Sequence, residues 1–258
     1  MAAQSFPPAF PPAFPPVLLT RPAAASARFA DALRRAFGPA TTVFISPLME
    51  PEFLRPLIPP EQFDALILTS ETGAGAARRL SAEGASLPTR AFCVGDRTAN
   101  AAVAAGFAAQ SARGDAQGLV RLIDTTDRHS RFLHLHGQET TGDIVQQLGN
   151  LGIFACGAVV YRQRPLTLTP EAEKLLAGRN PVIVPLFSPR SADLLGHAGP
   201  VAAPLLIAAL SAAVADRAAT LHPQRMIIVQ RPDADAMLRA IESLGVGGPL
   251  LNPSRREG

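Results

Sequence analysis

Short runs of apolar residues alternate with longer stretches of mixed polarity along most of the 258-residue chain. The runs have the length of buried strands, and the stretches between them carry apolar residues at helical spacing. We predict strands at 17–19, 42–45, 65–68, 90–94, 132–135, 153–161, 181–186, 205–210 and 226–229. We predict helices at 23–37, 98–105, 116–123, 142–148, 191–195, 213–220 and 233–243, and an alanine-rich helix directly after residue 70. This alternation is typical of α/β proteins, in which helices cover both faces of parallel sheets.

Two parts of the chain repeat one plan: strand, hydroxyl-bearing turn, helix, strand, turn of small residues, alanine-rich helix. The first is LILTSETGAGAARRL followed by AFCVGDRTANAAVAAGF, and the second is PLFSPRSADLLG followed by IAALSAAVADRAATLHP. An internal repeat of this size predicts two similar doubly wound parallel-sheet domains. A single doubly wound sheet of nine strands is the alternative interpretation.

The first two predicted strands are too few to form a stable sheet by themselves, so they must join strands from elsewhere in the chain. The proline-rich segment 46–63 and the extended segment VYRQRPLTLTP are both suited to be linkers. We therefore expect a discontinuous first domain, an inserted second domain and a two-stranded linker that spans one cleft. The expected boundaries are a disordered proline-rich tail at 1–16, the first domain at 17–47 and 162–246, the second at 48–161, and a flexible C-terminal tail at 247–258.

Composition excludes several classes of protein. The 24 basic and 21 acidic residues leave a formal charge of only +3 with no basic cluster, which argues against nucleic-acid binding but suits an acidic small molecule. Cys93 and Cys156 lie in separate apolar runs, so we expect free, buried thiols in a reducing compartment. The apolar segment 201–215 is shorter than the roughly 20 residues of a membrane span and contains Pro204. We therefore expect a cytoplasmic protein without membrane contact.

Polar residues follow several of the predicted strands, where the next helix begins. In open α/β sheets ligands bind beyond the carboxyl ends of the strands, and helix N-termini there favour carboxylate or phosphate. The candidates are Arg21 with its neighbours Thr20 and Pro22, Thr69 and Ser70, Gly95 with Thr98, Ser188 with Pro189, and Ser211. Helix capping alone accounts for such hydroxyls equally well. Neither a P-loop nor a G-x-G-x-x-G motif occurs, so no nucleotide cofactor is expected.

Patterns of catalytic and metal-binding residues are sparse. His134 and His136 belong to one predicted strand, where we expect them to alternate faces and therefore not to share a metal ion. Ser188 has no evident base, and G-x-S-x-G is absent. We expect no metal, and a reaction that needs little from the protein beyond position and charge.

The ordered motifs along the chain nevertheless resemble a known family. VLLTRP, ALILTSETGA, FCVGDRTA, LHLHG, VVYRQRP, LFSPRSADLL, ALSAAVADRA and IIVQRPDADAMLRAI occur in the order seen in bacterial uroporphyrinogen-III synthases, over about residues 17–244. The resemblance implies two α/β domains joined by a two-stranded linker. It also implies a lyase that closes hydroxymethylbilane, a linear tetrapyrrole, into uroporphyrinogen III with inversion of the terminal ring and loss of water.

The resemblance implies roles for individual residues as well. Tyr161, the only tyrosine in the chain, matches the linker tyrosine of the family and would act as a general acid. Thr69, Ser70, Thr98 and Ser188 match positions that line the family's cleft. The chain departs from the family at His136, where many relatives have arginine, and at 211–213, where Ser-Ala-Ala replaces glycine and threonines.

The family also implies a monomer without cofactor, with possible transient contact to the preceding, bilane-forming enzyme. The alternative function is a non-catalytic two-domain module that binds an acidic small molecule.

Overall fold

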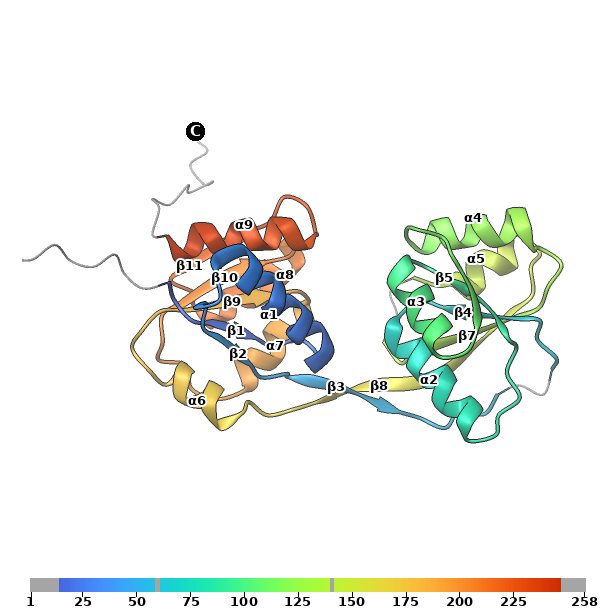
Figure 1. The fold of residues 1–258 in the computed structure, drawn as a ribbon, viewed down its shortest axis with the longest axis horizontal. Coiled ribbons are helices and arrows are strands. Elements are labelled where there is room, and N and C mark those ends of the chain that lie inside the picture. Colours follow the sequence, from blue (N-terminus) through green and yellow to red (C-terminus); the bar gives the residue numbers. More distant parts are fainter. Residues whose placement is uncertain (1–13, 59–60, 140–141, 247–258) are drawn as a thin grey trace, which may run out of the picture. The chain divides into compact units, whose positions relative to one another are not determined.

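The computed structural model describes residues 14–58, 61–139 and 142–246, which form a mixed α/β chain with two separate, mostly parallel sheets (Figure 1). The chain divides into two compact units. Unit 1 consists of Met1–Glu50 and Pro165–Gly258, and unit 2 consists of Pro51–Arg164. The expected fold class, two α/β domains of which one is discontinuous, is confirmed, and the alternative of a single nine-stranded sheet is wrong.

The sheet of unit 1 has five parallel strands in the order β11-β10-β9-β1-β2. The strands are β1 (Val17–Leu19), β2 (Val43–Ile45), β9 (Val182–Leu186), β10 (Leu205–Ala209) and β11 (Arg225–Ile228). Every residue of β1, β9 and β10 is buried, as expected for central strands of a parallel sheet.

Helices cover both faces of this sheet. They are α1 (Ala23–Phe37), α6 (Pro170–Leu176), α7 (Pro189–His197), α8 (Ala212–Ala218), the 3₁₀ turn η1 (Ala219–Leu221) and α9 (Ala234–Gly245). The apolar faces of α1 and α9 pack on one side of the sheet, and those of α6, α7 and α8 pack on the other. Unit 1 therefore has two cores, one on each face of the sheet.

The sheet of unit 2 has six strands in the order β3-β8-β7-β4-β5-β6. They are β3 (Met49–Phe53), β4 (Ala65–Leu68), β5 (Arg90–Cys93), β6 (Ala108–Ser111), β7 (Phe132–Gly137) and β8 (Ala155–Pro165). All the pairs from β8 to β6 are parallel. Helices α2 (Glu71–Ala82) and α3 (Asp96–Ala104) cover one face, and α4 (Ala116–Thr126) and α5 (Ile144–Asn150) cover the other.

The chain crosses between the units twice, and both crossings are extended. They fall within β3 and at the end of β8, which are neighbours in the sheet. Leu54 N donates to Val160 O at 2.9 Å, and Leu166 N donates to Leu48 O at 2.9 Å. Because the residue number rises on one strand as it falls on the other, the two strands run antiparallel.

Several local features differ from the sequence prediction. The short elements β3, β6 and α6 were not expected. Residues 1–13 of the expected N-terminal tail, and all of the C-terminal tail 247–258, lie outside the described residues. Phe14, however, packs on Phe37 with ring centroids 5.2 Å apart, so the packed part of unit 1 begins before residue 17. Pro16 supports this start, because its carbonyl accepts from Ile183 N at 2.9 Å.

Both cysteines are free, as expected. Cys93 is buried in β5, and burial raises its pKa to about 11. Cys156, the second residue of β8, is only half-buried, contrary to the expectation. No helix of the described segments is long and apolar enough to cross a membrane.

Candidate functional site

In each unit the chain adds strands first on one side of a central strand and then on the other, and several of the predicted site residues lie at this reversal. In unit 2 the chain runs from β4 outward to β6, then returns to the other side of β4 with β7 and β8. In unit 1 the chain runs from β1 to β2, then continues on the other side of β1 with β9. Ligands of open α/β sheets bind at such reversals, beyond the carboxyl ends of the strands. The reversals place Thr69 and Ser70 opposite the end of β7, and Arg21 opposite Ser188.

Tyr161 and Ser70 are in direct contact at the carboxyl edge of unit 2. Their hydroxyl oxygens lie 3.1 Å apart, and either can be the donor. Ser70 is the N-cap of α2, and its hydroxyl accepts from Gly73 N at 2.9 Å. Capping and contact with the tyrosine are thus combined in one serine.

Thr69 points to the opposite face of the sheet, next to His134. Its Oγ1 is 3.5 Å from Nε2 of His134. His134 is only 5% exposed, and burial, followed by the charge of His136, lowers its pKa to about 4, although Asp143 opposes the shift. His134 is therefore neutral at physiological pH.

The expectation that His134 and His136 lie on opposite faces of the strand is wrong. Residues two apart on a strand share a face, and the two ring centroids are 4.8 Å apart. Both rings line a hollow of about 580 Å³, together with Asp143, Gly157 and neighbouring residues. Within the described residues, however, no group of three or more His, Cys, Asp or Glu side chains is placed to hold a metal ion.

Gly95 and Thr98 follow β5, one strand away from the reversal in unit 2. Gly95 is the N-cap of α3 and has no side chain to cap the helix. Thr98 is only 5% exposed. At this helix start the backbone N–H groups, rather than the threonine hydroxyl, are therefore available to an anion.

Arg21, Ser188 and Pro189 lie at the reversal in unit 1, where β1 and β9 are neighbours. The guanidinium of Arg21 lies 4.0 Å from the ring centroid of Phe187, the residue before Ser188. Ser188 is the N-cap of α7, accepts from Ser191 N at 3.1 Å, and lies 2.8 Å from the Ser191 hydroxyl. Pro189 occupies the first turn of α7, where its missing N–H is not needed.

Ser211 follows β10, beside the strand that leads to Ser188, and caps α8 by accepting from Val214 N at 3.4 Å. The structure thus brings the predicted residues together in two sets, one in each unit. It also adds residues that the sequence analysis missed, above all Gly137 and Phe187. A glycine at the end of a buried strand often marks close backbone approach, and this signal was available at Gly137.

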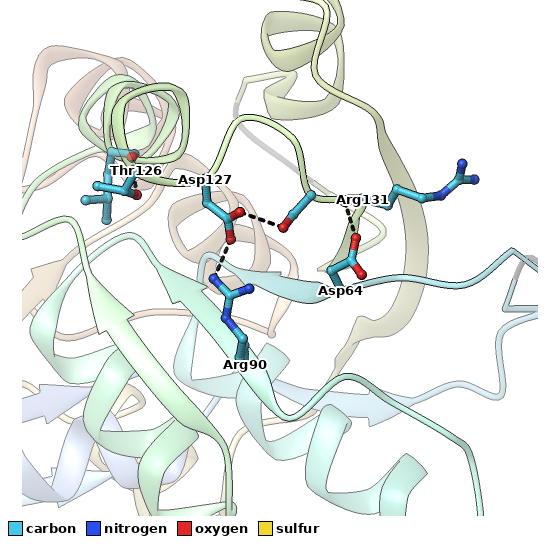
Figure 2. A network of polar contacts seen from close by, with 7 residues as sticks. Asp64, Arg90, Thr126, Asp127 and Arg131 are labelled. Atoms are coloured by element: carbon cyan, nitrogen blue, oxygen red, sulfur yellow. Dashed lines mark hydrogen bonds and ion pairs between the residues drawn. The ribbon is translucent and has the colours of Figure 1, made fainter.

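A polar network lies at the amino edge of the unit 2 sheet (Figure 2), whereas Ser70 and Tyr161 lie at the carboxyl edge of the same sheet. Arg90 pairs with Asp127, which also accepts from the Ser130 hydroxyl at 2.6 Å. Arg131 N donates to Asp64 Oδ2 at 2.8 Å, where β4 and β7 begin. The network ties together the starts of three strands, β4, β5 and β7.

Comparison with known proteins agrees with the sheet topology. The crystal structure of uroporphyrinogen-III synthetase from Helicobacter pylori 26695 has a TM-score of 0.61 and 17% sequence identity, and the match covers 89% of this chain and 99% of that one. Uroporphyrinogen III synthase from Thermus thermophilus matches over the same shares with 14% identity and a TM-score of 0.36. No curated protein shows a significant match to the sequence. The family model described as Uroporphyrinogen-III synthase HemD matches residues 27–239, which include parts of both units. The chain therefore belongs to the uroporphyrinogen-III synthase family of tetrapyrrole biosynthesis.

Proposed function

We propose that this chain is a lyase that closes hydroxymethylbilane into uroporphyrinogen III with loss of water, and that Tyr161 is its general acid. The family match over residues 27–239 carries the proposal, because it spans both units. The position of Tyr161 supports its role, since its hydroxyl lies at the carboxyl edge of unit 2 beside Ser70.

The proposed reaction balances without a cofactor. The Tyr161 hydroxyl gives a proton to the departing hydroxyl of the bilane, the C–O bond breaks, and water leaves. The electron-rich pyrrole stabilises the resulting cation. The substituted carbon of the terminal ring attacks this cation to form a spiro intermediate, which opens and recloses with the ring inverted. A proton is then lost and can return to the Tyr161 oxygen.

Orientation is the main task of the protein in this proposal. The unaided bilane closes end to end, so the enzyme must hold it where the inverting attack is near. The starts of α2, α3, α7 and α8 favour carboxylates through their N–H groups and positive partial charge. We assign substrate contacts to Arg21, Thr69, Ser70, Gly95, Ser188, Pro189 and Ser211, and to Thr98 through its backbone N–H.

The assay that tests the proposal supplies the protein with freshly generated hydroxymethylbilane and separates the uroporphyrinogen isomers. We expect the type III isomer to dominate. Only type I product, formed at the rate without protein, would contradict catalysis. Saturable binding of the bilane without type III product would favour the alternative, a non-catalytic binding module.

We also expect a cytoplasmic monomer, with at most transient contact to the bilane-forming enzyme. Sedimentation of the purified chain checks its oligomeric state.

A further inference from the structure

Gly137 leaves the space in which the Tyr161 ring lies. A Cβ atom at Gly137 would be 2.7 Å from two ring carbons of Tyr161 and 2.9 Å from its hydroxyl oxygen. Gly137 is not among the residues with positive φ in the described part of the chain. The requirement for glycine is therefore steric, and any side chain at this position must displace the ring.

A bulge in β8 turns Tyr161 toward Gly137. His136 pairs with Val159, but the next residue, Gly137, pairs with Tyr161, so β8 contains one extra residue, Val160. Successive residues of a regular strand point to opposite faces, and a bulge re-aims the side chain that follows it. As a result, Val160 and Tyr161 both pack against the core under α2 and α3. The backbone is held there because Gln138 N donates to Tyr161 O at 2.9 Å.

The position of Ser70 is fixed by helix α2. Its hydroxyl accepts from Gly73 N at 2.9 Å, which ties it to the first turn of α2. That turn lies close to β7, since a Cβ at Gly73 would be 3.1 Å from the carbonyl oxygen of Leu135. Gly73 thus allows α2 to approach the end of β7, and Gly137 allows the tyrosine ring to approach it. Because both lie there, the hydroxyl oxygens of Ser70 and Tyr161 are 3.1 Å apart.

We infer that Gly137 and Ser70 are positioning residues for Tyr161. Gly137 leaves the room in which the ring lies, and Ser70 forms a hydrogen bond with its hydroxyl. The inference rests on the proposed function, in which Tyr161 gives up a proton. A serine hydroxyl has one proton and two acceptor lone pairs. With one lone pair taken by Gly73 N, Ser70 can still donate to the Tyr161 oxygen. That hydrogen bond strengthens as negative charge develops on the oxygen.

Turnover of single variants, and of the same variants in a Tyr161→Phe background, tests the inference. Gly137→Ala should lower kcat about 10²-fold, because small displacements of a reacting group have effects of that size. Ser70→Gly should also lower kcat, and it keeps a residue type that is accepted at the N-cap. Gly137→Ala should leave KM nearly unchanged, because Gly137 is not among the assigned substrate contacts. In a Tyr161→Phe background, neither should cause much further loss. Ser70→Thr, which keeps the hydroxyl, should retain most of the activity.

The single tyrosine provides a readout that does not depend on turnover. The chain has one tyrosine and no tryptophan, so NMR of ¹³C-labelled tyrosine observes Tyr161 alone. We expect its ring resonances to shift in Gly137→Ala and in Ser70→Gly. Asp115→Ala is the matched control, because Asp115 caps α4 by accepting from Gly118 N at 2.8 Å and has no tyrosine beside it. That control should lose stability without moving the tyrosine resonances.

Two results would overturn the inference. One is unchanged tyrosine resonances in Ser70→Gly, which remains informative if Gly137→Ala does not fold. The other is the same fold-loss of kcat in the presence and absence of the Tyr161 hydroxyl. Wild-type kcat in Tyr161→Phe together with shifted resonances would instead refute the acid role while leaving the placement of the ring supported.

Discussion

Glu52 on β3 and Arg162 on β8 form a two-bond ion pair across the strands on which the chain crosses between its units. Arg162 Nε donates to Glu52 Oε2 at 2.8 Å, and Nη2 donates to Oε1 at 3.1 Å. The pair lies between the backbone bonds from Leu54 to Val160 and from Leu166 to Leu48, so it supports the same antiparallel register. Arg162 lowers the pKa of Glu52, first through its hydrogen bond and then through its charge.

The first prediction concerns the acid titration of this pair. Because the folded pKa of Glu52 lies below its ordinary value, the pair stabilises the fold above that value, and the effect is lost as the pH falls through the folded pKa. Arg162→Ala should raise the titration midpoint of Glu52 toward the ordinary glutamate range in carboxyl ¹³C NMR, although the charge of Arg164 still lowers its pKa. Arg128→Ala is the control, because it removes an exposed arginine that pairs with Asp124 and donates to the Leu151 carbonyl, not to Glu52. A Glu52 midpoint that does not move in Arg162→Ala contradicts the assignment.

Tyr161→Phe should slow formation of the type III isomer about 10²- to 10⁴-fold, the usual range for loss of a general acid. The fold should remain intact, because the phenylalanine ring still fits over Gly137. Circular dichroism and the isomer assay check both statements. Wild-type kcat in this variant would remove Tyr161 from the mechanism.

His134 should make the protein less stable in mild acid. Its pKa falls from 6.5 to about 4 on folding, so between these values the unfolded chain binds more protons than the folded one. Stability should therefore decrease as the pH drops from 6.5 toward 4, by at most about 3 kcal/mol from this residue. Denaturant titrations of His134→Gln should show a weaker decrease, whereas His129→Gln, at an exposed position, should follow the wild type. Parallel curves for His134→Gln and the wild type would exclude this source of acid sensitivity.

Phe14 should contribute measurably to the stability of unit 1. Phe14→Ala removes a half-buried ring that packs on Phe37 and on the core under α1 and α9, at a cost of about 1 to 3 kcal/mol. Deletion of residues 1–13 should leave turnover unchanged, because their proline-rich sequence has no packing pattern. Thermal unfolding and the isomer assay measure the two effects. A large loss of turnover in the deletion would assign a function to the removed residues.

Asp127→Asn should lower stability without lowering turnover. Asp127 accepts from Ser130 and pairs with Arg90 at the amino edge of the unit 2 sheet (Figure 2). Tyr161 lies at the carboxyl edge of that sheet. Because the arginine is half exposed, the expected cost is about 1 kcal/mol. Chemical denaturation should detect this cost, while kcat and KM keep their wild-type values. A kcat loss comparable to that of Tyr161→Phe would mean that the two edges of the sheet are coupled.

The main strands and helices could be predicted because their signals are local. Helix α1 and strand β4 have the predicted bounds, since buried parallel strands are continuous apolar runs, and Pro22 and Gly38 flank the helix. The missed elements have no such signal. Strand β3, MEPEF, is extended because it pairs with β8, and β6, AAQS, is an edge strand with polar residues. Helix α6 has only seven residues.

The sequence by itself determined the α/β class, the repeated hydroxyl turns and the one tyrosine among the candidate site residues. Which of these residues meet was decided by tertiary structure. Tyr161 contacts Ser70, 91 residues away, because β8, β7 and β4 are neighbours in the sheet and because a bulge turns the ring onto Gly137. Strand order and register depend on the free energies of long-range strand pairing, summed over the whole sheet. They therefore cannot be predicted from any short stretch of residues.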